Sequence, residues 1–313
     1  MDEWIWTLGL GPGLPQLDWP EDRHVVAVRA GPVPTKLGYR TVGGLRIRCA
    51  ECGGGSATES ILMTSPWPES IFAFAPIWTA LAQRCRVVTV DLPGFGGSER
   101  DDDLLSPRAM GEFLLEFIEQ SELDRPHLVA PDVGTPAALF AAASQPDAVS
   151  SLVVGSGGVA VPLQLTGPLA EWVVAPDLDR YRSIDPRAIV GVALDTIEGY
   201  EMPPEIREDY LDSYDGDRFV ESMRYARAYP DQLPELAGLL PAIGTPVQVI
   251  AGRRDRVVPL SNAEFLEANL PNCRLAVLDA GHFVWEEAAD EYESIVLDWA
   301  TGGYRNAAPA APR

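Results

Sequence analysis

The chain has 313 residues, of which 46% are hydrophobic and 22% are charged, as expected for one large globular domain with an insertion or for two modest domains. Its formal net charge is -22, so its surface repels phosphate backbones and anionic lipid headgroups. We therefore expect no nucleic-acid partner, no membrane partner and a neutral small-molecule substrate, and a homodimer stays open as an assembly.

The N-terminus and the cysteines bear on location and on metal binding. Residues 1–4 lack the basic start of a signal peptide, and no apolar stretch reaches the roughly 18 residues of a membrane helix. Cys49 and Cys52 form a CxxC motif, but Cys85 and Cys273 stand apart with no histidine beside them, so a closed zinc site lacks ligands. We expect reduced thiols, a cytoplasmic location, no metal and no cofactor.

Strands and helices alternate over the first half of the chain. Residues 1–36 are rich in proline and glycine and predict an irregular extension, and residues 38–51 predict a hairpin around Gly43-Gly44. We then expect strands at 60–64, 86–90, 127–130 and 151–154, separated by helices at 74–83, 107–121 and 136–143. Such alternation favours a mostly parallel sheet with helices on both faces.

Helices alone follow between residues 158 and 242, where we expect them at 162–174, 186–199, 204–212 and 218–228. The alternation then resumes with strands at 247–251 and 274–278 and helices at 261–269 and 288–299. The sequence therefore predicts an α/β fold with a core at 37–157 and 243–301, a helical cap at 158–242 and a flexible tail at 302–313.

Asp132 lies at the predicted junction between a strand and a helix. Ala130 and Gly134 stand two residues before and after it, and a sharp strand-to-helix turn requires small residues at those places. The start of a helix favours negative charge, so a carboxylate suits the apex of this turn. The alternative is that Asp132 simply caps the helix.

His282 and Asp255 are candidates for a base and an acid. His282 follows the last predicted strand, whereas the other two histidines, His24 and His127, lie in the extension and at the start of the Asp132 strand. Asp255 follows the preceding strand, where an ordinary turn aspartate is the plain alternative. The chain order of nucleophile, acid and base is the order of the α/β-hydrolase triad.

Together with two loops, these residues make the chain resemble the α/β-hydrolase superfamily over about residues 37–301. The loop Val90-Asp-Leu-Pro-Gly-Phe-Gly-Gly-Ser98 is similar to the loop after the fourth strand of these enzymes, where Asp91 is expected to turn the chain. The segment Ser65-Pro-Trp-Pro-Glu-Ser70 resembles their His-Gly-x-Pro oxyanion loop with its first two residues changed. An aspartate at the elbow indicates the branch of epoxide hydrolases and haloalkane dehalogenases.

That resemblance implies a role for each site residue. Asp132 is the nucleophile that forms an alkyl ester, His282 activates the water that hydrolyses the ester, and Asp255 orients His282. The backbone amides of Trp67 and Val133 form the oxyanion hole. The change to Ser65-Pro66 in the loop is a departure that bears on the oxyanion geometry.

The leaving group separates the two enzyme classes of this branch. Haloalkane dehalogenases resemble each other in a tryptophan directly after the nucleophile, where this chain has Val133, so Trp67 alone remains as a halide donor. Epoxide hydrolases use tyrosines of the lid as proton donors. Tyr225 is the best match, with Tyr181, Tyr200 or Trp172 as its partner.

We therefore predict a hydrolase that opens an epoxide to a vicinal diol. A haloalkane or haloacid dehalogenase that uses the same ester is the first alternative, and a non-catalytic ligand-binding protein of this fold is the second. A serine hydrolase would need Ser156, which follows the next strand and has Val154 where a small residue belongs.

Overall fold

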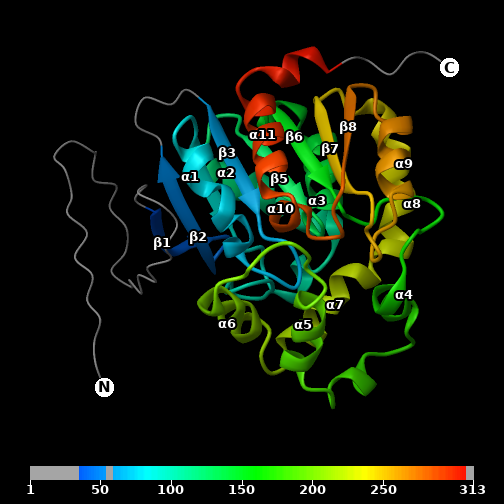
Figure 1. Cartoon of the computed structure of the whole chain (residues 1–313). Helices are drawn as coiled ribbons and strands as arrows, with labels where there is room; N and C mark the ends of the chain where they lie inside the picture. The colour runs from blue at the N-terminus through cyan, green and yellow to red at the C-terminus, as the bar shows by residue number, and fades with distance from the viewer. Residues whose placement is uncertain (1–34, 54–58, 308–313) are drawn as a thin grey trace, which may run out of the picture.

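The computed structural model describes residues 35–53 and 59–307. Eight strands form one sheet in the order β1-β2-β4-β3-β5-β6-β7-β8 (Figure 1). The strands are β1 Thr35–Val42, β2 Leu45–Gly53, β3 Ser60–Thr64, β4 Arg86–Val90, β5 His127–Pro131, β6 Ser151–Gly155, β7 Val247–Gly252 and β8 Cys273–Leu278. β1 and β2 pair antiparallel as the predicted hairpin, β2 is antiparallel to β4, and the pairs from β4 to β8 are parallel.

Helices cover both faces of the sheet. The central strands β5, β6 and β7 are buried at every position, as expected for parallel strands between two helical layers. α1 and α11 pack together over one face, whereas α2, α3, α8 and α9 lie over the other (Figure 1). These helices are α1 Ala75–Ala82, α2 Pro107–Gln120, α3 Gly134–Ser144, α8 Tyr229–Leu239, α9 Ser261–Asn269 and α11 Ala289–Ala300. The predicted α/β fold is confirmed.

The helical cap lies beyond the carboxyl ends of the parallel strands (Figure 1). It contains α4 Gly167–Val174, α5 Pro186–Leu194, α6 Pro204–Ser213 and α7 Arg218–Arg227. The sequence did not predict α8, because Pro234 interrupts its helical pattern. α8 packs on α2 and α3 of the core, so the predicted cap range 158–242 includes one helix that belongs to the core by its contacts.

The predicted ends of the domain differ from the structure at both sides. β1 already begins at Thr35, inside the extension predicted for residues 1–36, whose residues 1–34 lie outside the described residues. Part of the predicted flexible tail is helical, because Gly303–Asn306 form a short 3-10 helix. The ring of Tyr304 lies 5.0 Å from the buried ring of His127, and this contact holds the segment against the sheet. Residues 308–313 of the tail lie outside the described residues.

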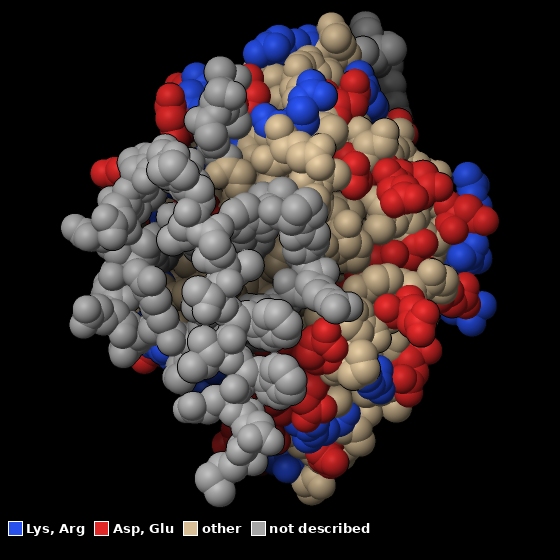
Figure 2. Space-filling view, turned by 60° about the vertical axis from the view of Figure 1, so that its left-hand side comes forward, with Lys and Arg blue, Asp and Glu red and all other residues tan. Residues whose placement is uncertain are grey.

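Acidic side chains dominate the charge of the chain, with 46 acidic and 24 basic residues. In the view of Figure 2, acidic groups stand next to one another over parts of the visible described surface, interspersed with fewer basic ones. In residues 35–53 and 59–307, we find no helix that is both long enough and apolar enough to span a bilayer.

Candidate active site

Asp132 occupies a strained turn between β5 and α3. Its φ angle is 51°, in the left-handed region that residues other than glycine rarely adopt. The Asp132 N–H donates to the Gly155 carbonyl at 2.8 Å, and the Asp132 carbonyl accepts from the Thr135 N–H at 3.0 Å. A Cβ atom on Gly134 would lie 2.3 Å from Oγ1 of Thr64, so only glycine fits there. The predicted elbow is present.

The two carboxylate oxygens of Asp132 have different surroundings. Oδ2 accepts a hydrogen bond from the Trp67 amide at 2.6 Å, and the Val133 amide also donates to this carboxylate. Oδ1 faces the ring of His282. The N-cap position of α3 is Val133, and no side chain caps the helix, so helix capping does not explain Asp132. The two amides predicted for the oxyanion hole both point at the aspartate.

His282 connects Asp132 to Asp255. Its Nδ1 lies 2.9 Å from Oδ2 of Asp255, and its Nε2 lies 3.8 Å from Oδ1 of Asp132. Oδ1 of Asp255 accepts from the amides of Val257 and Val258 at 2.8 Å each, which fixes the carboxylate. The structure therefore brings together the three predicted triad residues.

A glycine contact lets the two loops that carry the acid and the base approach each other. A Cβ atom on Gly252 would lie 1.8 Å from the carbonyl oxygen of Gly281. Gly252 ends β7, three residues before Asp255, and Gly281 directly precedes His282. Any side chain at position 252 would push the two loops apart, so this close contact sets the distance between Asp255 and His282.

The pKa values of the nucleophile and the base are both raised, but for different reasons. Burial raises the pKa of Asp132 to about 6, although His282 and the amides of Trp67 and Val133 offset part of this effect. Burial lowers the pKa of His282, but the charges of Asp255 and Asp132 outweigh it and raise the pKa to about 9. Near neutral pH the free protein therefore holds an ionised Asp132 beside a protonated His282.

The nucleophile and the base are both buried. Asp132 is 6% exposed and His282 is 7% exposed. Two surface hollows lie elsewhere, one beside α2 and the end of α3 and the other beside the segments that precede β5, β6 and β7, and no triad residue lines either. Asp132 and His282 are therefore buried beneath the cap-side surface rather than in either of these two hollows.

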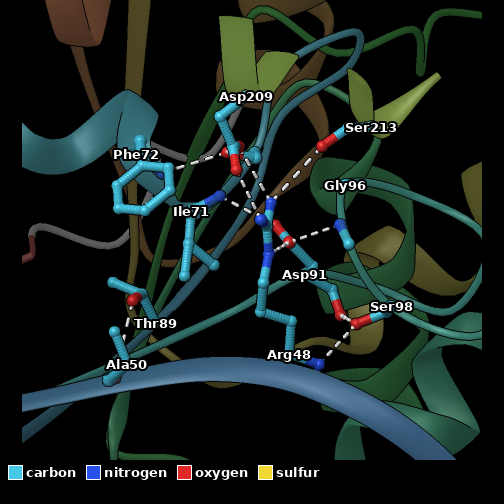
Figure 3. A network of polar contacts seen from close by, with 12 residues as sticks. Arg48, Ala50, Ile71, Phe72, Thr89, Asp91, Gly96, Ser98, Asp209 and Ser213 are labelled. Atoms are coloured by element: carbon cyan, nitrogen blue, oxygen red, sulfur yellow. Dashed lines mark hydrogen bonds and ion pairs between the residues drawn. The ribbon is translucent and has the colours of Figure 1, made fainter. Parts of the chain in front are cut away.

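Asp91 lies in a network between the core and the cap (Figure 3). Nε of Arg48, on β2, donates to Oδ2 of Asp91 at 2.5 Å, and the Arg48 guanidinium also donates to both oxygens of Asp209, on α6, at 2.6 and 3.0 Å. Asp91 also accepts from the amides of Ile71 and Gly97. Asp91 thus organises its own loop and the residues after the oxyanion loop, as its predicted structural role requires.

The predicted proton donors of the lid lie in different places. The Tyr225 hydroxyl donates to the Val133 carbonyl at 2.6 Å, beside the elbow. The ring of Trp172 lies 5.8 Å from the ring of Trp67. Tyr181 faces away, because its hydroxyl donates to Glu171 at 3.1 Å and accepts from Arg180. Tyr200 lies near Glu69 and Glu286.

Sequence reasoning missed three residues next to the site. Tyr229 is buried, its ring lies 5.9 Å from that of Tyr225, and the charge of Asp132 acts on its phenol. Its spacing of four residues from Tyr225 was the available signal. Glu69 and Glu286 are buried within the segments that follow Trp67 and His282. Their burial could not be predicted from a pattern, because charged residues are rarely buried.

Proteins bind metal ions through sets of ligand side chains. Within the two described segments, no group of three or more histidine, cysteine, aspartate or glutamate side chains is arranged to hold a metal ion.

Comparisons with known proteins agree with the fold. Residues 53–295 match the model of the "Alpha/beta hydrolase family". The chain is 27% identical over 272 residues to a 2-hydroxy-6-oxononadienedioate/2-hydroxy-6-oxononatrienedioate hydrolase of Klebsiella pneumoniae, which covers 82% of this chain and 91% of that enzyme. The family match and this relative support hydrolase activity.

Solved structures show the same fold at lower identity. Cfl2 of Burkholderia cenocepacia has a TM-score of 0.73 at 23% identity, over 85% of this chain and 96% of that one. The enol-lactonase of Burkholderia xenovorans has a TM-score of 0.70 at 19% identity, over 84% and 99%. The fold, the elbow and the family match lead to one conclusion: this chain belongs to the alpha/beta hydrolase family.

Proposed function

We propose that this hydrolase opens an epoxide to a vicinal diol through a covalent ester on Asp132. One observation carries the proposal: a carboxylate occupies the elbow, with Oδ2 bonded to the Trp67 amide at 2.6 Å and Oδ1 facing Nε2 of His282 at 3.8 Å. Oδ1 is thereby available to attack a carbon atom, while Oδ2 already occupies the place where negative charge develops when water attacks the ester.

In the first half-reaction, Oδ1 attacks an epoxide carbon. The C–O bond of the ring breaks, and the released oxygen takes a proton from a phenol near Asp132. We assign this donor to Tyr229, supported by Tyr225. In the described part of the chain, no residue hydrogen-bonds the Tyr229 hydroxyl, whereas that of Tyr225 is held by Val133. Burial, assisted by the Asp132 charge, raises the pKa of both phenols, which therefore remain protonated.

In the second half-reaction, water hydrolyses the ester. Esterification removes the charge of Asp132, one of the charges that raise the pKa of His282. The pKa of His282 therefore falls, and more of the ring is neutral and able to accept a proton near neutral pH. His282 takes a proton from the water that attacks Cγ, and Oδ2 carries the negative charge against the amides of Trp67 and Val133. Cleavage of the Cγ–Oδ1 bond releases the diol as an alkoxide, which takes its proton from His282. The proton of the new Asp132 carboxyl group returns to the phenolate of Tyr229, so both residues are restored.

Dehalogenation by the same ester is the second candidate. The Trp67 indole N–H is buried, and in residues 35–53 and 59–307 it has no hydrogen-bond partner. Its ring stacks on Phe219 at 5.3 Å and stands edge-on to Trp172, so its orientation is fixed. A buried indole donor without an acceptor fits a halide as well as it fits an oxygen atom.

Two other activities have less support. The relative from Klebsiella and the enol-lactonase are named for other hydrolytic reactions, and a serine nucleophile in this chain would have to be Ser156. Ser156 has a φ angle of 48° and a buried hydroxyl, but Nε2 of His282 faces Asp132 instead. A purely ligand-binding role would leave unexplained why acid, base and elbow carboxylate are aligned.

Trapping the ester tests the proposal and separates the two leading candidates. His282→Gln removes the base, so the ester accumulates. The variant is incubated with a panel of epoxides and a matched panel of haloalkanes and haloacids, and then digested for mass spectrometry. An epoxide adduct on the Asp132 peptide supports the proposal, and an adduct from halides alone supports dehalogenation. The control Asp132→Asn/His282→Gln must show no adduct, and a lack of adducts from both panels contradicts both candidates.

A further inference from the structure

Two buried glutamates lie side by side next to the candidate active site. Glu69 is 0% exposed and Glu286 is 3% exposed. Glu69 belongs to the oxyanion loop, two residues after Trp67, and Glu286 belongs to α10 Val284–Glu287, which directly follows His282 and Phe283. Buried carboxylates are costly unless a cation or hydrogen bonds compensate them.

Each glutamate has one oxygen with a donor and one oxygen without. Oε2 of Glu69 accepts from the Trp285 indole at 2.9 Å, and Oε1 of Glu286 accepts from the Tyr210 hydroxyl at 3.1 Å. The remaining oxygens, Oε1 of Glu69 and Oε2 of Glu286, are buried and receive no hydrogen from any donor in the described residues. The carboxyl groups of Glu69 and Glu286 lie close enough to act on each other, and two ionised carboxylates in this arrangement would repel each other.

The groups that face this pair are acidic or neutral. Asp132 acts on Glu69, and Glu287 acts on Glu286. Tyr200 and Tyr210 face the pair from the cap. Among the described groups that act most strongly on the pair, none is a cation. A proton is therefore the charge that can compensate two adjacent carboxylates here.

We propose that Glu69 and Glu286 share one proton, and that this carboxyl–carboxylate hydrogen bond positions the oxyanion loop against the helix that follows His282. Glu69 donates, and Glu286 accepts. The bond joins the segment that carries the Trp67 amide to the segment that carries the base, so it sets the distance between Oδ2 of Asp132 and its donor. Both glutamates are positioning residues, since neither has to touch the substrate.

The shared proton gives the fold a pH dependence of known sign. Burial raises the pKa of Glu69 well above its ordinary value, with the Glu286 charge adding, and burial raises the pKa of Glu286 to about 7. A group whose pKa is raised by folding stabilises the fold fully below its unfolded pKa, and that stabilisation is lost as the pH rises through the folded pKa. The pair therefore stabilises the protein most at acidic pH and progressively less as the pH rises through neutral into the alkaline range.

Glu69→Gln and Glu286→Gln test the proposal without relying on activity. The amide that Glu69→Gln introduces donates to Glu286 at every pH, so the melting temperature of this variant should decline less than that of the wild type from about pH 6 to about pH 9. Glu286→Gln should flatten the same decline. The control Glu119→Gln changes an exposed residue of α2 and should keep the wild-type profile. If both variants at the pair also keep the wild-type profile, the shared proton is excluded.

An infrared spectrum of the wild-type protein gives a second test that needs no variant to fold. At about pH 8, above the pKa of about 6 of Asp132, the spectrum should contain the carbonyl band of one protonated carboxyl group. Assignment of this band to a glutamate requires that it shifts on selective isotope labelling of glutamate at the carboxyl carbon. A spectrum with no protonated carboxyl band overturns the proposal.

The positioning role rests on the proposed function and is tested separately. Glu69→Ala breaks the link to Glu286, so ester hydrolysis should slow by about 10- to 100-fold, less than the roughly 10²- to 10³-fold loss on removal of an oxyanion donor, while ester formation changes little. Glu69→Gln should restore the rate and extend activity to higher pH. If no ester forms in the wild type, the proposed function fails but the infrared and melting tests still stand. If the ester forms and Glu69→Ala hydrolyses it at the wild-type rate, the positioning role is wrong.

Discussion

Nε2 of His282 lies 3.8 Å from Oδ1 of Asp132, too far for a strong hydrogen bond but correctly placed for an ion pair. In a serine triad the histidine must hydrogen-bond the nucleophile to remove its proton. A carboxylate needs no such help, because it is already ionised when the pH lies above its pKa. The gap leaves His282 free to act on water in the second half-reaction, and this difference leads to the first prediction.

The two half-reactions should respond differently to pH. Formation of the ester requires ionised Asp132, whose pKa is raised to about 6, so the alkylation rate should fall about tenfold for each pH unit below that value. His282→Gln should raise the apparent pKa of alkylation, because the His282 charge lowers the pKa of Asp132, while ester hydrolysis is abolished. Rapid-quench measurement of ester formation between about pH 4 and pH 8 checks this. A pH-independent alkylation rate would show that Asp132 is not the nucleophile.

Asp255→Asn should slow the second half-reaction more than the first. The carboxylate accepts from Nδ1 of His282 at 2.9 Å, and an amide in its place no longer stabilises a protonated ring or favours the correct tautomer. In triads the corresponding change lowers the rate by about 10⁴, and we expect a loss of about 10² to 10⁴ in ester hydrolysis here. The trapped ester should then be visible by mass spectrometry even with His282 intact. Equal losses in both half-reactions would argue against this separation of roles.

Tyr229→Phe should lower the alkylation rate with an epoxide by about 10²-fold, because a general acid contributes about 10² to 10⁴. Tyr225→Phe is the matched comparison on the neighbouring helix, and its hydroxyl is already committed to the Val133 carbonyl at 2.6 Å. We expect a smaller effect of Tyr225→Phe on alkylation. Stopped-flow measurements with one epoxide compare the two variants, and a larger loss in Tyr225→Phe would reverse the assignment of the donor.

Arg48→Met should destabilise the protein by about 3 to 5 kcal/mol, because it leaves the fully buried Asp91 without its cation. It also releases Asp209 of the cap. Chemical denaturation measures the loss. The double variant Arg48→Met/Asp91→Leu should recover part of it, because the second change removes the unpaired charge. If Arg48→Met has the stability of the wild type, the network of Figure 3 contributes nothing to folding.

Gly134→Ala should lower stability by about 1 to 3 kcal/mol and activity by about 10²-fold, because its Cβ would lie 2.3 Å from Oγ1 of Thr64 and shift the elbow. Gly38→Ala is the control, since a Cβ on Gly38 meets no atom within 4 Å. Thermal unfolding and ester formation are measured for both. Similar behaviour of the two variants would mean that the elbow tolerates a side chain.

The triad could be predicted from the order of its residues along the chain, because in this fold the order of the strands determines where the loops after them lie. Asp132, Asp255 and His282 each follow a strand of one parallel sheet, and the carboxyl ends of such strands meet at one edge. Small residues marked the elbow at Gly134, because the turn leaves no space for a side chain. Local rules of this kind can be read from a few neighbouring residues.

Other features depend on contacts between distant segments, which no local pattern records. Glu69 accepts a hydrogen bond from the Trp285 indole, 216 residues away in the sequence, and Arg48 donates to Asp209, 161 residues away. The helix α8 was missed because Pro234 interrupts its helical pattern, although packing against α2 and α3 stabilises the helix. Sequence also placed Tyr181 among the proton donors, but its hydroxyl is committed to Glu171 and Arg180. Tertiary packing decided each of these points.

A single turnover in heavy-oxygen water tests the central claim most directly. With enzyme in excess over an epoxide, water attacks Cγ of the ester, so the oxygen transferred to the diol comes from Asp132 and the heavy oxygen enters the protein. We predict a diol without label and a peptide containing Asp132 that is heavier by one oxygen exchange. Label in the diol of the first turnover, with none in the Asp132 peptide, would show that water attacks the epoxide directly and would contradict a covalent ester.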